Sequence, residues 1–163
     1  MNWELFWAAL GSLSTMAAFI IAIFQPTFQK IITKKKIITS FRTDMEAFAP
    51  SAPDMVNEKM CTVSITNNGY NSIFISSVDL LVDGRYYNQL RIPDNQIINQ
   101  IYYVKFPYEL KIGEKMQVNF SKQALKKKML SLNPTEPVKI AITDTSNKQI
   151  IKSTDKTVRD IIN

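Results

Sequence analysis

Residues 61–84 read CTVSITNNGYNSIFISSVDLLVDG. From residue 61 to 66 apolar side chains alternate with Thr and Ser, which is the pattern of a strand with one buried face. Turn-forming residues follow, and then a β-rich run over 73–82, in which two adjacent serines shift the alternation as a β-bulge would. Asp83-Gly84 ends the stretch with a strong signal for a two-residue hairpin. The stretch therefore predicts three strands joined by two tight turns.

Similar patterns continue on both sides of this stretch. Further strands are expected at 37–42, 85–90, 101–106, 138–143 and 149–153, two more within 108–120 around a Gly-Glu turn, a helix at 121–130 with Ser121 as its N-cap, and one or two helical turns in the tail, 154–163. Residues 44–58 contain two prolines and little periodicity, so we expect a loop there. Seven or eight short strands with one helical insert predict a mainly β fold, either an immunoglobulin-like β-sandwich or a small β-barrel, over residues 59–153.

The N-terminal segment has a different composition. From Trp3 to Phe24 the only charged residue is Glu4, and a helix of about 20 apolar residues can span the hydrocarbon layer of a bilayer. A secretory signal peptide would have positive charge before the apolar run and a small-x-small cleavage site after it, and neither is present. A buried core helix would show a polar face. We therefore expect a single transmembrane helix within residues 1–29.

Aromatic residues lie at both ends of this expected span: Trp3 and Trp7 one turn apart at its start, and Phe24 near its finish. Such residues collect at membrane–water interfaces. Pro26 predicts that the helix bends or ends there.

Basic residues flank the span on one side only. None precedes it, whereas Lys30, Lys34, Lys35, Lys36 and Arg42 follow it in a basic segment, 30–43, that also holds the first strand. The positive-inside rule then places the N-terminus outside the cell and the β domain in the cytoplasm. We expect the four lysines to contact anionic lipid headgroups.

One stripe of the expected span is small. It consists of Gly11, Thr15, Ala18 and Ala22. Small residues let helices approach closely, and Ser or Thr can add hydrogen bonds between helices. The stripe suggests a homo-oligomer, although small residues are also common in spans that do not associate.

The residues that most enzymes and metal sites need are scarce. The 163 residues include no His and one Cys, Cys61, which the alternation places in the core. Each glycine is isolated, so no phosphate-binding glycine loop can be written. The acids Asp79, Asp83 and Asp144 lie near expected turns, where Asp favours local hydrogen bonds. We therefore expect no enzyme, no cofactor and no metal.

Three lysines, Lys126, Lys127 and Lys128, mark a candidate binding surface on the expected helix. Together with the pairs Tyr86-Tyr87 and Tyr102-Tyr103 they could form a stacking and phosphate-binding surface for single-stranded nucleic acid. Lysine runs are more often solvated or in contact with headgroups, and strand alternation alone explains one inward and one outward Tyr in each pair. Nucleic acid is therefore the less favoured partner.

Four segments carry a resemblance: the WE-starting span that ends before Pro and lysines, VSITNNGYNSIFISSVDLLV, FPYELKIGEKMQVNF and VKIAITDTSNKQI. Their order resembles small bacterial and prophage proteins that have one membrane anchor and a cytoplasmic immunoglobulin-like domain, some of which are similar to superinfection-exclusion proteins of Gram-positive hosts. In that family Pro often follows the Asn-x-Gly turn, whereas this chain has Asn71-Ser72.

The resemblance implies a non-enzymatic, membrane-anchored binding protein that blocks the passage of phage DNA through the membrane, and so acts in antiviral defence. Its partners would be membrane lipid and another membrane or phage protein. Two alternatives stay open: an oligomerising membrane effector or structural subunit of a membrane complex, and an anchored nucleic-acid binder.

Overall fold

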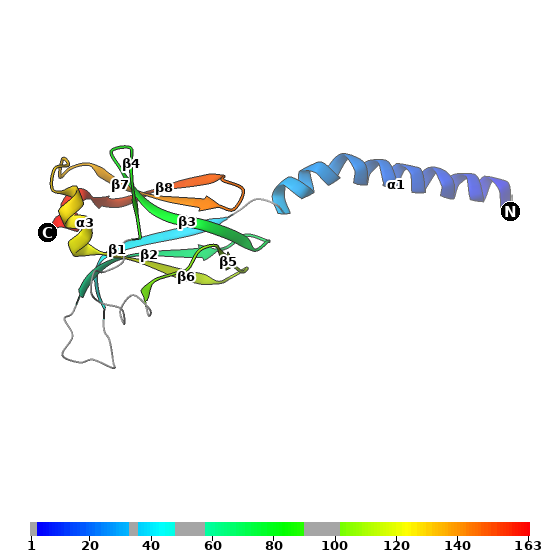
Figure 1. Ribbon diagram of the computed structural model, residues 1–163. Coiled ribbons are helices and arrows are strands. Elements are labelled where there is room, and N and C mark those ends of the chain that lie inside the picture. The colour runs from blue at the N-terminus through cyan, green and yellow to red at the C-terminus, as the bar shows by residue number, and fades with distance from the viewer. Residues whose placement is uncertain (1–2, 33–35, 48–57, 90–101) are drawn as a thin grey trace.

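The structure, a computed structural model, describes residues 3–32, 36–47, 58–89 and 102–163 (Figure 1). In chain order its elements are α1 (Trp3–Ile32), β1 (Ile37–Ala47), β2 (Glu58–Asn67), β3 (Ile73–Val82), β4 (Arg85–Asn88), β5 (Tyr108–Leu110), β6 (Lys115–Ser121), α3 (Lys122–Met129), β7 (Pro137–Asp144), β8 (Gln149–Thr157) and α4 (Val158–Ile162). The fold is therefore mainly β, as the sequence predicts.

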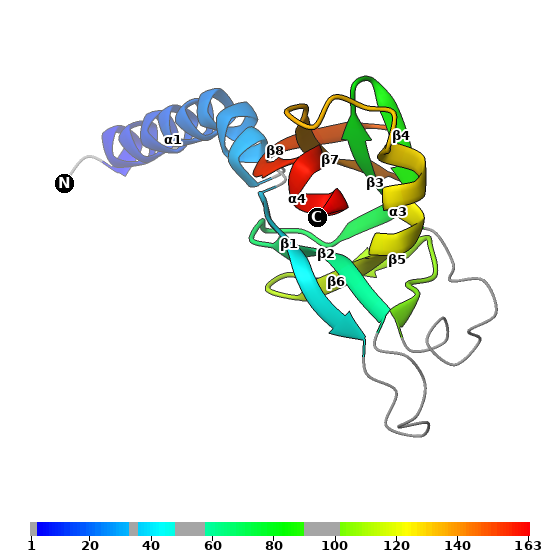
Figure 2. The same ribbon diagram turned by 90° about the vertical axis from the view of Figure 1, so that its left-hand side faces the viewer.

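The described strands form two antiparallel sheets. One has the order β1-β2-β6, and the other has the order β4-β3-β7-β8, with β5 also paired to β3. The two sheets lie face to face, and α3 and α4 lie at one end of them (Figure 2). Because each set of described strands makes its own sheet, the arrangement is that of a β-sandwich and not of a small barrel.

The core lies between the sheets and follows from the alternation in the sequence. Cys61, Val63 and Ile65 of β2 are fully buried, as are Leu80 of β3 and Phe120 of β6. Full burial of one such aliphatic or aromatic side chain is worth about 1.5–3 kcal/mol. The two inner faces therefore supply the main driving force for folding.

Two local predictions in the opening stretch are confirmed. The pairing of β3 with β7 shifts register between Ile75 and Ser77, where the serines predict a bulge. Asp83 and Gly84 have φ angles of 48° and 71°, and two central residues with positive φ match the type I′ turn that suits a two-residue hairpin. β4 then pairs back onto β3.

The predicted strand at 101–106 is wrong over the described residues 102–106. No strand forms there, although Val104 and Phe106 pack against the core. The carbonyl oxygen of Tyr102 instead accepts hydrogen bonds from the side chains of Asn119, at 3.2 Å, and Gln89, at 3.4 Å. Polar side chains therefore satisfy a backbone group that a strand would have paired in a ladder.

Two strands are longer than predicted. β1 continues to Ala47, so residues 44–47 are not part of a loop, and a register shift between Arg42 and Met45 carries the pairing with β2 onward. β8 continues to Thr157, so only the last part of the expected helical tail is helix α4. The remainder of the predicted loop, 48–57, lies outside the described residues.

Helix α1 also exceeds its predicted end. It continues for six residues past Pro26 to Ile32. A proline inside a helix removes one hydrogen bond and costs about 3 kcal/mol, and the helix tolerates that cost here. α1 projects away from the sandwich at the end opposite α3 (Figure 1).

Candidate functional site

Helix α3 is a short basic helix whose two faces differ. Ser121 precedes it, and the Ser121 hydroxyl accepts a hydrogen bond of 3.2 Å from the backbone N–H of Ala124, as predicted for an N-cap. Leu125 and Met129 are fully buried against the sandwich. The side chains of Lys126, Lys127 and Lys128 are exposed, so α3 presents a positively charged surface to solvent.

The structure places these lysines relative to α1. They lie on α3, at the end of the sandwich farthest from α1 (Figures 1 and 2). Their distance from α1 separates them from the lysines that follow α1 in the sequence. The three lysines are a solvated basic surface that faces away from α1.

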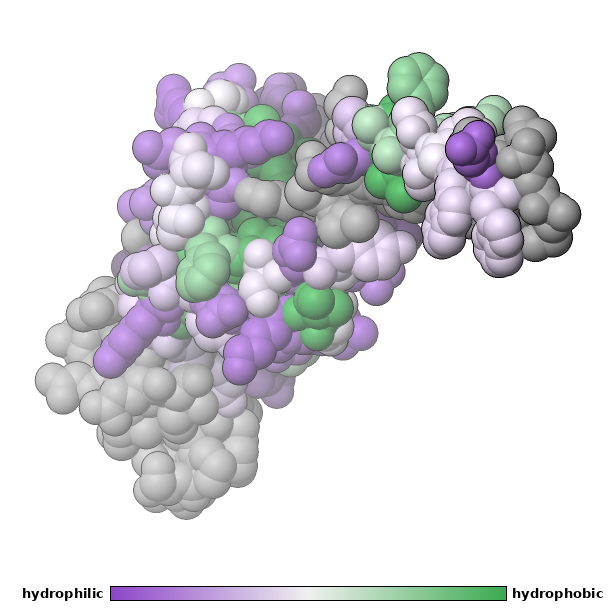
Figure 3. Space-filling model, turned by 90° about the vertical axis from the view of Figure 1, so that its right-hand side faces the viewer, coloured by the Kyte–Doolittle hydropathy of each residue, from purple (hydrophilic) through white to green (hydrophobic). Residues whose placement is uncertain are grey.

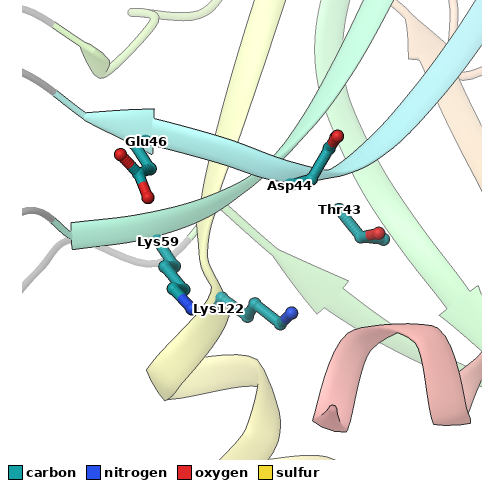
Figure 4. A pocket seen from close by; sticks show the side chains of 5 residues that line it. All are labelled: Thr43, Asp44, Glu46, Lys59 and Lys122. Atoms are coloured by element: carbon teal, nitrogen blue, oxygen red, sulfur yellow. The ribbon is translucent and has the colours of Figure 1, made fainter.

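A polar pocket of about 250 Å³ lies beside the start of α3. Its lining comes from β1, β2 and α3: Thr43, Asp44, Glu46, Lys59 and Lys122. In Figure 4 the side chain of Lys59 extends toward the base of Lys122, the side chain of Lys122 runs away from Lys59, and Asp44 projects away from both lysines. The sequence does not predict this pocket, because residues 44–58 are expected to form a loop. Asp44 and Glu46 are two residues apart, which is the spacing of neighbours on one face of a strand.

The pocket brings opposite charges together without closing them into an ion pair. Glu46 and Lys59 are direct partners in the pairing of β1 with β2. The ion pair found in the described part of the chain joins Lys156 to Asp155, outside the pocket. The pocket can therefore offer both ammonium and carboxylate groups to a polar partner, and it contains no nucleophile paired with a base.

Cys61 is not a reactive thiol in this fold. It is fully buried in β2, and burial raises the pKa of its thiol to about 12, while the nearby charge of Lys122 opposes that rise. Thiolate is the nucleophilic form of cysteine, so this residue acts as a small apolar core residue, as predicted.

The acids singled out from the sequence have structural surroundings. Burial raises the pKa of Asp79, and a hydrogen bond of 2.9 Å from the Ser77 hydroxyl opposes that rise. The Asp144 carboxylate accepts hydrogen bonds from the backbone N–H groups of Ser146 and Lys148, both at 2.9 Å, and so ties the turn after β7. Among the described residues, no group of three His, Cys, Asp or Glu side chains could hold a metal ion.

The predicted membrane residues are placed in part. In α1 the side chains of Trp3, Trp7 and residues 11–26, which include the small stripe and Phe24, are exposed. Of the four lysines that follow the span, the structure describes the side chain of one, Lys36, which is exposed. Lys34, Lys35 and the side chain of Lys30 lie outside the residues and side chains that the structure describes. Across the described part of the chain, the structure offers no helix whose length and apolar character would together suffice to cross a membrane.

Thr15 of the small stripe uses its hydroxyl within its own helix. The hydroxyl donates to the carbonyl oxygen of Gly11 at 2.8 Å, as does that of Ser14. Such back-bonding occupies the donor that was expected to reach another helix. A Cβ atom added at Gly11 would meet nothing within 4 Å, so the stripe is open.

The tyrosine pairs do not all face solvent. Tyr87 is buried in the core and Tyr86 is half exposed, as strand alternation requires. The hydroxyl of Tyr86 donates to the side-chain oxygen of Gln149 at 3.2 Å. Tyr102 and Tyr103 are partly buried. Of these four rings, Tyr86 is therefore the most open to a stacked base.

No protein-family model matches this chain, and no curated protein is similar enough to it to count as a relative.

Proposed function

We propose that this chain is a non-enzymatic binding protein in which α1 anchors a β-sandwich at the cytoplasmic face of the cell membrane. The single observation that carries the proposal is the exposed apolar surface of α1. Large side chains that project from it into solvent are Trp3, Trp7, Leu13, Met16, Phe19, Ile20, Ile21, Ile23 and Phe24. A contiguous apolar surface of this kind is unfavourable in water and favourable in lipid.

The dimensions of α1 agree with an anchor. Its 30 residues extend over about 45 Å at 1.5 Å per residue, whereas the hydrocarbon layer is about 30 Å thick. The proposal depends on the whole sequence run from Trp3 to Phe24, including residues whose side chains lie outside the description. The lysines that follow the run favour a cytoplasmic sandwich.

The order of the strands supports an immunoglobulin-like sandwich in particular. Immunoglobulin sandwiches place the first, second and fifth strands on one sheet and the third, sixth and seventh on the other, with an added strand beside the third in variable-type domains. Here β1, β2 and β6 share one sheet, and β3, β7 and β8 share the other, where β4 lies beside β3. Fold alone does not imply function, so the binding role is argued from the surfaces of the domain.

The basic surface of α3, made of Lys126, Lys127 and Lys128, is the side that would meet a partner, because it lies farthest from α1 (Figure 1). The most specific form of the proposal is superinfection exclusion, in which this surface binds an incoming phage protein at the membrane and stops DNA from passing. The resemblance of the sequence to superinfection-exclusion proteins supports this form.

A phage challenge tests the proposal. Cells that express the full chain should adsorb phage normally but admit little phage DNA. Exchange of the three α3 lysines for glutamate should restore DNA admission at an unchanged level of protein in the membrane fraction. Lys105→Glu with Lys139→Glu, two exposed lysines outside α3, is the control for charge reversal and should leave protection intact. Normal admission of DNA in the presence of the natural chain would eliminate superinfection exclusion.

A membrane effector that oligomerises through α1 is the second candidate. It is supported by the open surface at Gly11 and by the exposure of the small stripe. Gly11→Leu should abolish self-association in detergent micelles, whereas Ser12→Leu, which faces another side of α1, should not. Equal oligomers of both variants would remove this candidate.

Nucleic-acid binding is the third candidate, since α3 carries four lysines and no acid. It requires an affinity that falls steeply with salt, because bound lysines release counterions from the phosphates. An affinity for single-stranded DNA that does not change with salt would exclude it.

A further inference from the structure

We propose that the end of the sandwich nearest α1 is itself a lipid-binding surface, which seats the domain on an anionic bilayer. The surface is formed by four exposed apolar side chains, here called the apolar rim: Ile38, Tyr70, Phe74 and Ile112, whose exposed fractions are 52%, 65%, 50% and 60%. The inference rests on the proposed function, because it takes α1 to be in the membrane.

The rim residues come from four segments that hydrogen bonds hold together. The backbone N–H of Asn68, in the turn that carries Tyr70, donates to the carbonyl oxygen of Lys36 at 2.8 Å. The N–H of Gly113, next to Ile112, donates to the carbonyl oxygen of Asn67 at 2.8 Å. The four segments therefore meet at one end of the sandwich. Ile38 and Phe74 alternate with buried neighbours and so lie on the outer faces of the two sheets, while Tyr70 and Ile112 lie in the turns that connect the sheets.

This end is also the place where α1 joins the domain. α1 ends at Ile32 and β1 begins at Ile37, one residue after Lys36. Figure 3 looks onto this end, with α1 toward the viewer, and shows apolar side chains among polar ones on the sandwich surface beside the helix. If α1 is embedded in lipid, only a few residues separate the rim from the bilayer surface.

The distribution of exposed apolar side chains singles out the rim. The described sandwich has seven large exposed apolar side chains in all: the four of the rim, together with Tyr86, Leu130 and Ile151. More than half of them thus lie at the end nearest α1. Scattered exposed apolar residues need no explanation, whereas a cluster at one end indicates an interaction surface.

Charge decides what covers the rim. Lys36, Lys111, Lys115 and Lys148 are exposed around it. Of the nearby acids, Glu109 is exposed, and the carboxylate of Glu114 is occupied by hydrogen bonds from the backbone N–H of Lys111, at 2.7 Å, and from the hydroxyl of Tyr108, at 2.8 Å. Lysines near an anionic leaflet are attracted to it, so an aromatic and aliphatic rim among lysines fits anionic lipid.

Depth measurements on the full chain in vesicles test the inference. Because Cys61 is fully buried, a new exposed cysteine can be labelled selectively with a polarity-sensitive fluorophore. Three variants are labelled: Phe24→Cys in α1, Tyr70→Cys in the rim, and Leu130→Cys as the matched control, an exposed apolar residue beyond α3 with the same exposed fraction of 65%. Each is reconstituted into vesicles of phosphatidylglycerol and phosphatidylcholine, with or without bromine on the acyl chains.

We expect brominated lipid to quench most of the fluorescence at Tyr70→Cys and at Phe24→Cys, and none at Leu130→Cys. Lys111→Glu combined with Lys148→Glu, or vesicles of phosphatidylcholine alone, should reduce the quenching at position 70 and leave that at position 24 unchanged. Quenching at position 24 without quenching at 70 overturns the inference and leaves the membrane anchor standing. No quenching at position 24 overturns both the anchor and the inference. Equal quenching at positions 70 and 130 overturns the inference, because the rim would then contact lipid no more than the α3 end does.

Discussion

The two ends of the sandwich are stabilised differently. At the α1 end the side-chain amide of Asn67 hydrogen-bonds to the surrounding turns, whereas at the α3 end short helices with N-terminal caps cover the strands. Asn67 is fully buried and its side chain makes three hydrogen bonds: from Nδ2 to the carbonyl oxygens of Asn71 (2.8 Å) and Leu110 (3.0 Å), and from the N–H of Gly69 to Oδ1 (3.0 Å). At the other end a serine hydroxyl caps α3. Both Asn67 and Ser121 are buried, but the Asn67 side chain holds three backbone groups at once, whereas the Ser121 hydroxyl accepts one bond from α3. A buried polar network is costly to break and rigid, so the α1 end should be held more firmly than the α3 end.

Asn67→Ala should have the largest effect, because it leaves two carbonyl oxygens and one N–H without their partner. We expect the free energy of unfolding to fall by about 3 kcal/mol. Urea unfolding of the full chain in detergent measures it. Asn133→Ala is the matched control, since the side chain of Asn133 is exposed and its Oδ1 accepts hydrogen bonds from Thr135. If both variants lose the same stability, the two ends do not differ as described.

Ser121→Ala should cost less, about 1 kcal/mol, which is typical of losing an N-cap. Ser121→Thr should retain most of the stability, because Thr keeps the capping hydroxyl and places no charge at this buried position. The same unfolding measurement applies, and helical content at α3 can be followed by amide hydrogen exchange of Leu125. A loss from Ser121→Ala that equals that from Asn67→Ala would contradict the ranking.

Glu114→Gln tests the turn at the α1 end through pH. The hydrogen bond from the Lys111 N–H and that from the Tyr108 hydroxyl lower the pKa of Glu114. A depressed pKa in the folded state stabilises the protein above the unfolded pKa, and that contribution is lost as pH falls through the folded value. The variant should therefore be less stable than the natural chain near neutral pH and equal to it in acid, where both are uncharged. A difference that is constant with pH would rule out the carboxylate as its cause.

Asp79→Asn, in the middle of the sandwich, should have a small effect of opposite sign. Burial raises the pKa of Asp79, so its contribution to stability is present below the unfolded pKa and is lost as pH rises through the folded value. The variant should be more stable than the natural chain near neutral pH and equal to it in acid. Asp155→Asn, whose side chain is 79% exposed, serves as the control, and destabilisation by Asp79→Asn at neutral pH would show that the Ser77 contact outweighs burial.

The sequence predicts strands with alternating apolar and polar residues well, and it predicts segments held by distant side chains poorly. β2, β3, the Asp83-Gly84 turn and α3 follow from local patterns that tertiary contacts reinforce. Tyr102–Phe106 has strand-forming residues but no strand, because Asn119 and Gln89, which are distant along the chain, bind the Tyr102 carbonyl. Local propensity cannot foresee partners of this kind.

The candidate surfaces show the same limit. Lys126, Lys127 and Lys128 were identifiable as a run, but their place at the far end from α1 depends on the sandwich. The polar pocket and the apolar rim collect residues from three or four separate segments, and no short window of sequence contains either set. Tyr70 and Ile112 look like ordinary turn and strand residues until the hydrogen bonds of Asn67 and Gly113 bring their segments together.

The most direct test of the proposal that α1 anchors the sandwich at the cytoplasmic face is thiol accessibility at Leu130→Cys in intact cells that express the chain. The labelled site lies beyond α3, and the natural Cys61 is buried. We expect the chain to sediment with the membrane fraction and to react with a membrane-impermeant maleimide only after the cells are permeabilised. Reaction in intact cells would place the sandwich on the outer side of the membrane and contradict a cytoplasmic domain. Recovery of the chain in the soluble fraction would show that α1 is not an anchor.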